Sequence, residues 1–434
     1  MSESTYKLKT SYPILAVGIS MVGFISIKTG RDAVFFSQGD LQQLPLAYIF
    51  IAIASVPAAM MHLKAIERWG SRKVRTGVFL VAAFTFLGFV PFVDAEYKSP
   101  MMILFVLVPS LFAAVFAGAW LLAGDLLEGA SQQITRWAYS RIGAASMIGG
   151  IAGGLLAKGL SLFLPPRFLV VSGVVMLIIA GWISSKAHRK HPIKDDSSVS
   201  SEPNEVENDR KSRQSNSMLG PLTRELMRQR YILALFGISG LSALAALYID
   251  FQFYAMVTIS GKSHAQFFAN FYILLNGASL GLQLIVAPWM QSRFGVGGAL
   301  MVFPTALAGS TGIVSFTTTI LSRAILKVTE GGLKSSIHRS TWEQVFLPIG
   351  REKRAMAKTL VDGAFARMSE GMGAAVLYIW LSSAKTALKP QALAWISWVI
   401  IAAILLWILC TRYLVRLGCA DIDGVDNLIR LPDS

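Results

Sequence analysis

The sequence predicts an all-α integral membrane protein, and its composition together with its hydropathy pattern indicates this class. Hydrophobic residues make up 54% of the 434 residues and charged residues only 15%, whereas soluble domains carry roughly 25% charged residues. Apolar stretches of about 20 residues, the length that crosses a bilayer as a helix, recur along the chain. Because these stretches are long and continuous, we expect helices rather than the short alternating strands of a membrane barrel.

The apolar stretches form two sets of six predicted spans, separated by a polar segment. The segment 186–230 holds acidic residues and a serine-rich run and is too polar to pack. We therefore expect a cytoplasmic linker at 186–230 between a six-helix half at 1–185 and a second six-helix half at 231–434. The predicted spans are 12–36, 44–62, 76–94, 99–124, 141–161 and 167–185, then 231–258, 266–290, 296–317, 319–338, 355–384 and 391–414.

Two short motifs recur at a similar offset in the two halves. Arg68-Trp69-Gly70 follows the second span, and Arg293-Phe294-Gly295 follows the eighth. Asp32 in the first span is followed by aromatic residues, as is Asp250 in the seventh, and the offset from Asp32 to Asp250 is close to that from Arg68 to Arg293. Two repeated sets of six spans are typical of the major facilitator fold, in which 12 transmembrane helices surround a central cavity.

Loop charge predicts the orientation of the spans. The loop after the second span, the linker and the segment 351–358 are rich in Lys and Arg, while the alternate loops carry few basic residues. By the positive-inside rule, both termini lie in the cytoplasm of a multi-pass protein, which we place in a cell membrane of the bacterial inner-membrane type. The chain starts with a short polar stretch that leads directly into a long span, so we expect no cleavable signal peptide.

The formal net charge of +15 would suggest a nucleic-acid partner in a soluble protein. Here the basic residues lie mainly between spans, so we expect no nucleic acid and a monomer in the lipid bilayer. Gly277 to Gly281 matches a nucleophile-elbow pattern, but it lies inside an apolar helix and has no convincing histidine partner. We therefore expect no enzyme activity, no metal and no cofactor, and we expect Cys410 and Cys419 to be free thiols.

Ionisable side chains inside the spans are the candidate functional residues, because each costs roughly 2.5–3.5 kcal/mol at a helix centre. Lys28, Arg31 and Asp32 share one face of the first span. One acid does not balance two cations, which favours a face that meets an anionic solute. The alternative is an internal ion pair near the helix end.

The tenth span is the most polar. Lys327, Glu330, Lys334 and His338 recur at three- and four-residue spacing and predict one polar stripe. Such a helix cannot face lipid along its length, so we expect it to line a cavity between the halves. The alternative is an amphipathic helix on the cytoplasmic surface.

Several other charged positions are candidates for gating or ion pairs. Asp250 lies between Tyr248 and Tyr254, where it could couple transport to charge or pH or pair with a basic residue of the first span. For the residues near the eleventh span, pairing and solute contact stay equally open. The predicted gating or ion-pair residues are Asp32, Asp125, Arg141, Glu330, Lys358, Asp362, Arg367 and Glu370.

Several segments together resemble the nucleotide transporter family, also called ATP/ADP translocases. They are Lys28 to Ala33, Asp250 to Phe253, Arg293 to Gly298 and the segment from Glu343 to Arg367. The resemblance covers nearly the whole membrane region and is nearest to the bacterial relatives. It implies a major facilitator fold and a phosphate-bearing substrate, often one nucleotide exchanged for another. The chain departs from the family at Tyr254, where relatives often carry lysine.

These observations predict a secondary transporter, an antiporter of nucleotides or of another phosphorylated metabolite. Two alternatives stay open: a proton-coupled transporter of another anion or a lipid, and a sensor that binds a solute without moving it. The predicted substrate-binding residues are Lys28, Arg31, Lys327 and Lys334 for phosphate groups, Phe35, Tyr248 and Tyr254 for a base, and Asp250 and Asn276.

Overall fold

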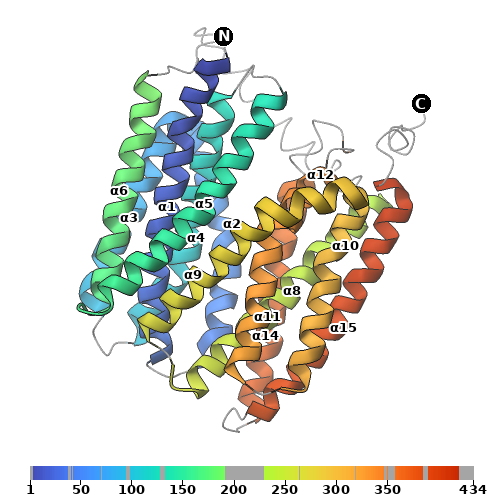
Figure 1. The fold of residues 1–434 in the computed structure, drawn as a ribbon. Helices are drawn as coiled ribbons and strands as arrows, with labels where there is room; N and C mark the ends of the chain where they lie inside the picture. Colours follow the sequence, from blue (N-terminus) through green and yellow to red (C-terminus); the bar gives the residue numbers. More distant parts are fainter. Residues whose placement is uncertain are drawn as a thin grey trace, which may run out of the picture.

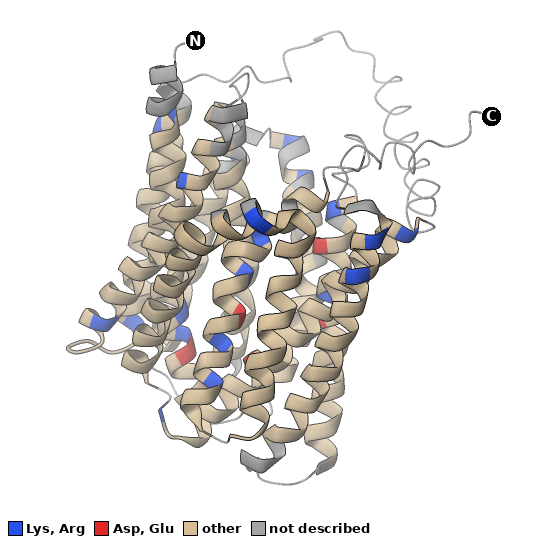
Figure 2. Ribbon diagram, turned by 45° about the vertical axis from the view of Figure 1, so that its right-hand side comes forward, with Lys and Arg blue, Asp and Glu red and all other residues tan. Residues whose placement is uncertain are grey.

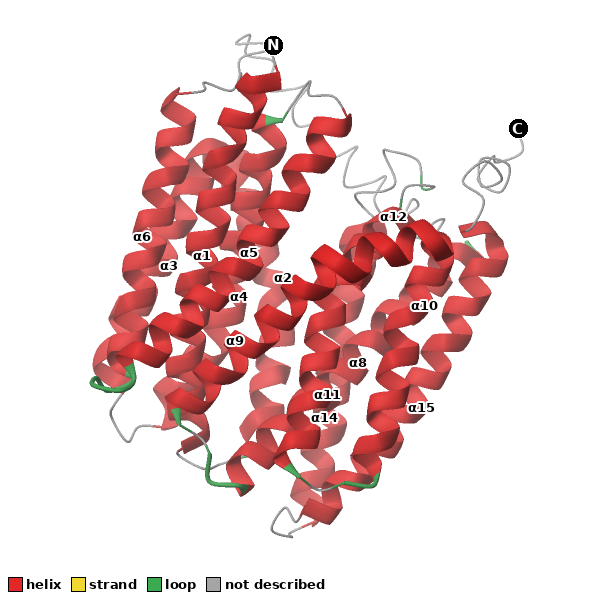
Figure 3. Ribbon diagram, in the orientation of Figure 1, coloured by secondary structure: helices red, strands yellow, loops and turns green. Residues whose placement is uncertain are grey.

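A computed structural model of the protein shows helices joined by turns and loops in the described residues, with no strand there (Figure 3). The structure describes residues 3–37, 41, 43–69, 71–93, 98–127, 132–190, 229–262, 264–317, 319–346, 349, 357–384 and 390–419. Most of the predicted linker lies outside these residues, so the domain boundaries at 185 and 230 stay predictions.

The first half of the chain forms a bundle around α1 (Figure 1). This helix packs against α4, α5 and α6, while α3 packs against α4 and α6. Small residues permit close approach: a Cβ on Gly149 of α5 would collide with the carbonyl oxygen of Gly18 on α1. The helices are α1 (Glu3–Ser37), α2 (Gln43–Trp69), α3 (Ser71–Val93), α4 (Lys98–Leu126), α5 (Gln132–Leu160) and α6 (Arg167–Lys190).

The second half forms a bundle around α8, which packs against α11, α14 and α15. Short π-helical segments interrupt its helices, and such segments often lie at functional sites. The α-helices are α8 (Arg230–Ile259), α9 (Ala265–Gly281), α10 (Ala287–Ser315), α11 (Ile320–Leu333), α12 (Arg339–Val345), α14 (Ala366–Ala384) and α15 (Pro390–Leu414). The π-helices are η2 (Leu282–Val286), η3 (Lys334–His338), η4 (Thr359–Phe365) and η5 (Val415–Cys419).

Each of the twelve predicted spans coincides with a helical segment. The eighth and ninth spans are divided at Gly295, where a φ of 63° kinks the helix within α10. Ten segments within the described residues are long and apolar enough to cross a membrane. The other two are α11 with η3 and η4 with α14, which carry the ionisable residues predicted for the tenth and eleventh spans.

The outer surface of the bundles is apolar. Ile53, Phe84 and Trp395 are 63%, 69% and 73% exposed. In Figure 2 the charged positions at mid-height lie mainly on the central helices, and the helices at the left edge are almost entirely tan there. A water-soluble protein rarely exposes so much apolar surface, whereas lipid is a suitable solvent for it. The chain is therefore a multi-pass membrane protein.

Candidate functional site

The interface between the two halves is formed mainly by pairs of helices, one from each half. The helix α5 packs against α9, and α2 packs against α14, while α1 also contacts α9. Below, the side of the molecule on which α1 begins is called the N-terminal side, and the side on which it ends is called the opposite side (Figure 1). Most of the predicted site residues lie at or near this interface between the halves.

Asp32, near the end of α1, joins the halves through a buried carboxylate. Its Oδ1 atom accepts from the guanidinium of Arg31, with Nε at 2.7 Å. Its Oδ2 atom accepts from the hydroxyl of Tyr254 on α8 at 3.2 Å and from the hydroxyl of Tyr272 on α9. The guanidinium also lies 4.0 Å from the ring of Phe105 on α4. We call Arg31, Asp32, Tyr254 and Tyr272 the Asp32 cluster.

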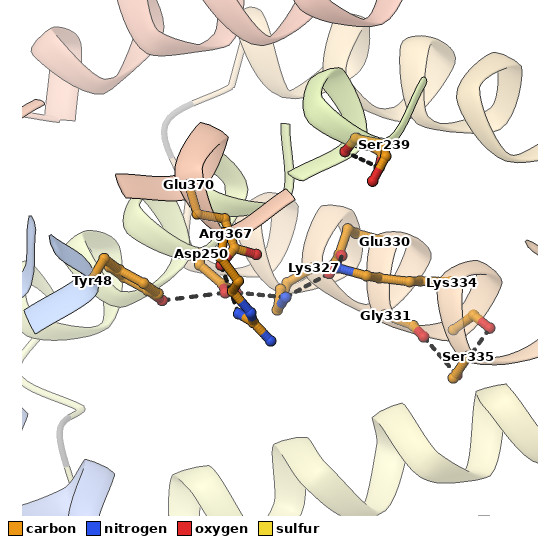
Figure 4. A network of polar contacts seen from close by, with 12 residues as sticks. Tyr48, Ser239, Asp250, Lys327, Glu330, Gly331, Lys334, Ser335, Arg367 and Glu370 are labelled. Atoms are coloured by element: carbon orange, nitrogen blue, oxygen red, sulfur yellow. Dashed lines mark hydrogen bonds and ion pairs between the residues drawn. The ribbon is translucent and has the colours of Figure 1, made fainter. Parts of the chain in front are cut away.

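Asp250 on α8 is the centre of a second polar group (Figure 4). Its carboxylate lies 2.5 Å from the ammonium nitrogen of Lys327 on α11, and that nitrogen also lies 2.5 Å from Glu330. Lys334 lies 3.6 Å from the other oxygen of Glu330. Tyr48 of α2 donates to Asp250 at 3.2 Å. We call Tyr48, Asp250, Lys327, Glu330 and Lys334 the Lys327 cluster.

The two clusters are reciprocal. Asp32 of the first half accepts from Tyr272 of the second, and Asp250 of the second half accepts from Tyr48 of the first. The offset between the two aspartates is close to the offset between the two tyrosines. The same contact is therefore made twice across the interface, as expected for two halves related by an internal repeat.

Lys28 differs from Arg31 and Lys327 because it contacts no carboxylate among the residues that the structure describes. Its ammonium nitrogen lies 4.6 Å from the centre of the Tyr272 ring and 5.9 Å from that of Phe24. Lys28 nevertheless interacts electrostatically with both Asp32 and Asp250, so it lies near both clusters. Aromatic faces compensate a cation only in part, which leaves Lys28 suited to hold an anion.

Three predicted solute contacts have packing partners in this structure. Tyr248 donates to the carbonyl oxygen of Gly373 on α14 at 3.4 Å. Asn276 donates to the carbonyl oxygen of Tyr272 at 2.8 Å, and its side chain lies directly against Gly150 of α5. The Tyr254 ring is stacked on Phe36 of the first half, with centroids 4.3 Å apart, in addition to its bond to Asp32.

Some of the predicted gating residues belong to the two clusters, and the others have separate contacts. Asp32 and Glu330 belong to the clusters, and Arg367 pairs with Glu370 at 2.6 Å within α14. Asp362 instead accepts from the Trp342 indole nitrogen at 2.8 Å, which joins η4 to α12. Lys358 has polar or electrostatic contacts of its own. Arg141 lies 4.4 Å from the ring of Trp137 on its own helix, and the structure does not describe the side chain of Asp125.

The prediction that His338 continues the polar stripe is wrong. Its ring is buried among Phe303, Trp342 and Trp407, the first and last of which lie on α10 and α15. The reason is that this helix changes neighbours along its length: α11 packs against α8 and α9 as well as α10, whereas η3 and α12 pack mainly against α10. One face of a helix therefore meets the interface at Lys327 and an aromatic core at His338.

The halves are packed tightly in the middle and separated toward the N-terminal side. A Cβ on Gly150 would collide with the side chain of Asn276, and one on Gly154 would lie 2.6 Å from Ile273, so α5 touches α9 there. Gly143 lies on the same face two helical turns nearer the N-terminal side, and it has open space beside it. The structure is therefore closed on the opposite side and open on the N-terminal side.

A contact of Arg339 also connects the halves on the N-terminal side. The guanidinium of Arg339 on α12 lies 5.2 Å from the centre of the Trp120 ring on α4. Trp120 in turn stacks on Tyr139 of α5, with centroids 5.7 Å apart. Sequence patterns do not point to these residues, because an exposed arginine and two aromatic residues are ordinary near the end of a span.

Comparisons with known proteins bear on the fold. No family model matches the sequence, and no curated protein matches it. Among solved structures, a mutant of the nucleoside transporter NupG is similar with a TM-score of 0.62 and 14% identity, covering 92% of this chain and 99% of that one. A bacterial homologue of the iron transporter ferroportin in an inward-facing state has a TM-score of 0.62 and 12% identity, covering 94% and 98%.

The POT family transporter PepTSo is also similar, with a TM-score of 0.63 and 10% identity over 94% of this chain and 98% of that one. At these identities the likeness establishes the fold alone. The chain has the all-α membrane architecture of the major facilitator transporters, which agrees with the arrangement that the sequence predicts.

Proposed function

We propose that this protein is a secondary transporter that moves a small anionic solute across the membrane by alternating access. The observation that carries the proposal is Lys28, a cation at the interface of two helical bundles with no carboxylate partner among the described residues. A charge at that depth is energetically unfavourable, and ionisable residues there normally mark a solute path. The fold supports a carrier, because the solved structures with this fold named above are transporters.

The solute contacts in this proposal are Lys28 and the Lys327 cluster. Lys334 is 49% exposed and shares Glu330 with Lys327, so it has ammonium protons left for an anion. Arg31 is less available, because its guanidinium is already bound to Asp32 and to the carbonyl of Phe105. A solute that approached from the open N-terminal side would reach Lys334 first and Lys28 beyond it.

The Asp32 cluster is the gate of the opposite side in this mechanism. Opening that side requires the hydroxyls of Tyr254 and Tyr272 to leave the Asp32 carboxylate, because the two tyrosines belong to the second half and Asp32 to the first. Arg31 stays with Asp32 in both states, since both lie on α1. Closure of the N-terminal side would replace the open space beside Gly143 with a contact to the second half.

We propose further that the solute bears phosphate and that transport is an exchange of nucleotides or other phosphorylated metabolites. The resemblance of the motifs around Lys28 and Asp250 to the nucleotide transporters supports this choice, and one similar fold belongs to a nucleoside transporter. Proton coupling is the second candidate, favoured by the Asp250 carboxylate, which Tyr48 and Lys327 share.

Thermal-shift screening of the detergent-purified protein against nucleotides, sugar phosphates and inorganic phosphate tests the proposal. A ligand at about 100 times its Kd stabilises the folded state by about 2.7 kcal/mol. We expect the stabilisation to disappear in Lys28→Gln and to persist in Lys158→Gln, an exposed lysine on α5. Lys28 is a better target than Arg31, whose removal would leave the buried Asp32 without its cation. Stabilisation by none of these compounds would contradict the proposal.

A further inference from the structure

The charges of the side chains at the centre of the interface do not sum to zero. Two ion pairs are neutral in themselves: Arg31 with Asp32, and Arg367 with Glu370. In the Lys327 cluster, Lys327 and Lys334 are balanced by Asp250 and Glu330. Lys28 is left over, so five cations face four carboxylates and this central set of side chains, which excludes Arg339 nearer the N-terminal side, carries a net charge of +1.

The charge of this interface matters when a carrier reorients. Alternating access passes through a state in which both sides are closed and the bound solute is enclosed with the cluster. Water no longer screens the charges in that state, and an uncompensated charge in a low-dielectric interior is strongly disfavoured. The enclosed state is therefore most accessible when the solute brings the charge that the interface lacks.

We propose that the transported solute carries a single net negative charge, which for a phosphate compound means a phosphodiester rather than a phosphomonoester. This inference rests on the proposed function and narrows its substrate class. A diester phosphate keeps one negative charge, whereas a monoester carries about two above its second pKa of about 6. Lys28 supplies the balancing charge, and the remaining pairs stay intact around the solute.

Matched phosphate pairs that differ in charge test this inference at about pH 8, where monoesters are fully ionised. The first pair is dimethyl phosphate against methyl phosphate, and the second is 3′,5′-cyclic AMP against AMP. Thermal-shift titrations of the full-length protein give an apparent Kd for each compound. We expect the singly charged member of a pair to bind about tenfold more tightly, because one unbalanced charge separates the two.

A soluble metabolite and a lipid headgroup both offer a phosphodiester. Dihexanoyl phosphatidylglycerol below its micelle concentration serves as the lipid arm, and cyclic AMP serves as the soluble arm. Tighter binding of the short-chain lipid would assign the site to a lipid, and tighter binding of cyclic AMP would assign it to a soluble metabolite. Both results retain the single charge.

Charge variants provide the decisive comparison. Asp250→Asn raises the net charge of the interface to +2 and should reverse the preference toward the doubly charged member of each pair. Glu370→Gln makes the same change at a half-buried position and serves if Asp250→Asn does not fold. Lys158→Gln removes a cation outside the interface and should leave the preference unchanged.

Tighter binding of the doubly charged members by the unmodified protein, or an order that no variant alters, would overturn the single-charge inference and leave the anion transporter intact. Stabilisation by none of the phosphate compounds would overturn the inference together with the proposed function. The two failures are therefore distinguishable.

Discussion

The gate formed by the Asp32 cluster makes a quantitative prediction about Tyr254 and Tyr272. Each hydroxyl donates to an ionised carboxylate across the interface, and such hydrogen bonds contribute about 1.5–3 kcal/mol. Replacing either tyrosine by phenylalanine removes one of these bonds and keeps the aromatic packing. Each variant should therefore shift the equilibrium toward opening of the opposite side by about 10- to 150-fold, and the double variant by more.

Distances between spin labels on the opposite side measure this shift. Leu162, after α5, and Ser260, after α8, are exposed on that side and belong to different halves. In a background without the two native cysteines, cysteines at these positions carry the labels. We expect the distance distribution to move to longer values in Tyr254→Phe and Tyr272→Phe, and furthest in the double variant.

Tyr413→Phe is the matched control for this experiment, because Tyr413 is 43% exposed on α15. It loses a tyrosine hydroxyl away from the Asp32 cluster and should leave the distances unchanged. A double variant with the same distances as the control would refute the assignment of Asp32, Tyr254 and Tyr272 as the gate.

Two further predictions concern the packing of the halves. Gly150→Leu places atoms where Asn276 lies and should lower the free energy of unfolding by about 1–3 kcal/mol. Gly143→Leu, in open space, should change it far less. Equal destabilisation of the two variants in thermal unfolding would contradict the open N-terminal side. Arg339→Gln removes the cation above Trp120, a contact that contributes about 0.5–1 kcal/mol at an exposed site. Distances between spin labels placed on the two halves at the N-terminal side should therefore become longer. Unchanged distances would show that this contact does not hold the halves together.

The helical architecture could be predicted because lipid imposes a simple rule on the sequence. Every span must be a helix with an apolar surface, so hydropathy alone locates α15 and the end of α1 within a few residues, although α1 begins earlier than predicted, at Glu3. The same rule explains why α11 and α14 are the two exceptions within the described residues. Their charged faces meet the other half or the interior rather than lipid, which permits Lys327, Glu330 and Glu370 to be there. Their remaining faces are exposed and apolar, as at Leu321 and Met372.

The sequence predicted that charged residues within the spans form ion pairs, but it did not predict which residues pair across helices. The internal pair of Arg31 and Asp32, one of two interpretations of the first span, is present. Pairing with a basic residue of the first span was one of two alternatives for Asp250, and its direct partner is instead Lys327 on α11. Spacing along one helix predicts neighbours within that helix, while partners on different helices depend on how the bundle is assembled.

Tyr48 and Tyr272 were missed because a tyrosine in an apolar span is unremarkable on its own. The signal that could have found them is the internal repeat, because the offset between these two tyrosines nearly equals the offset between the motifs at Arg68 and Arg293. Polar residues that recur at the repeat offset are good candidates for contacts between the halves of such a fold.

The measurement that most directly tests the central claim is exchange in proteoliposomes. A phosphate compound that stabilises the purified protein is loaded inside, and its labelled form is added outside. We predict accumulation of label in vesicles with the unmodified protein or Lys158→Gln, and none with Lys28→Gln. Binding without any exchange would contradict the carrier and favour a sensor, and full exchange by Lys28→Gln would contradict the role of Lys28.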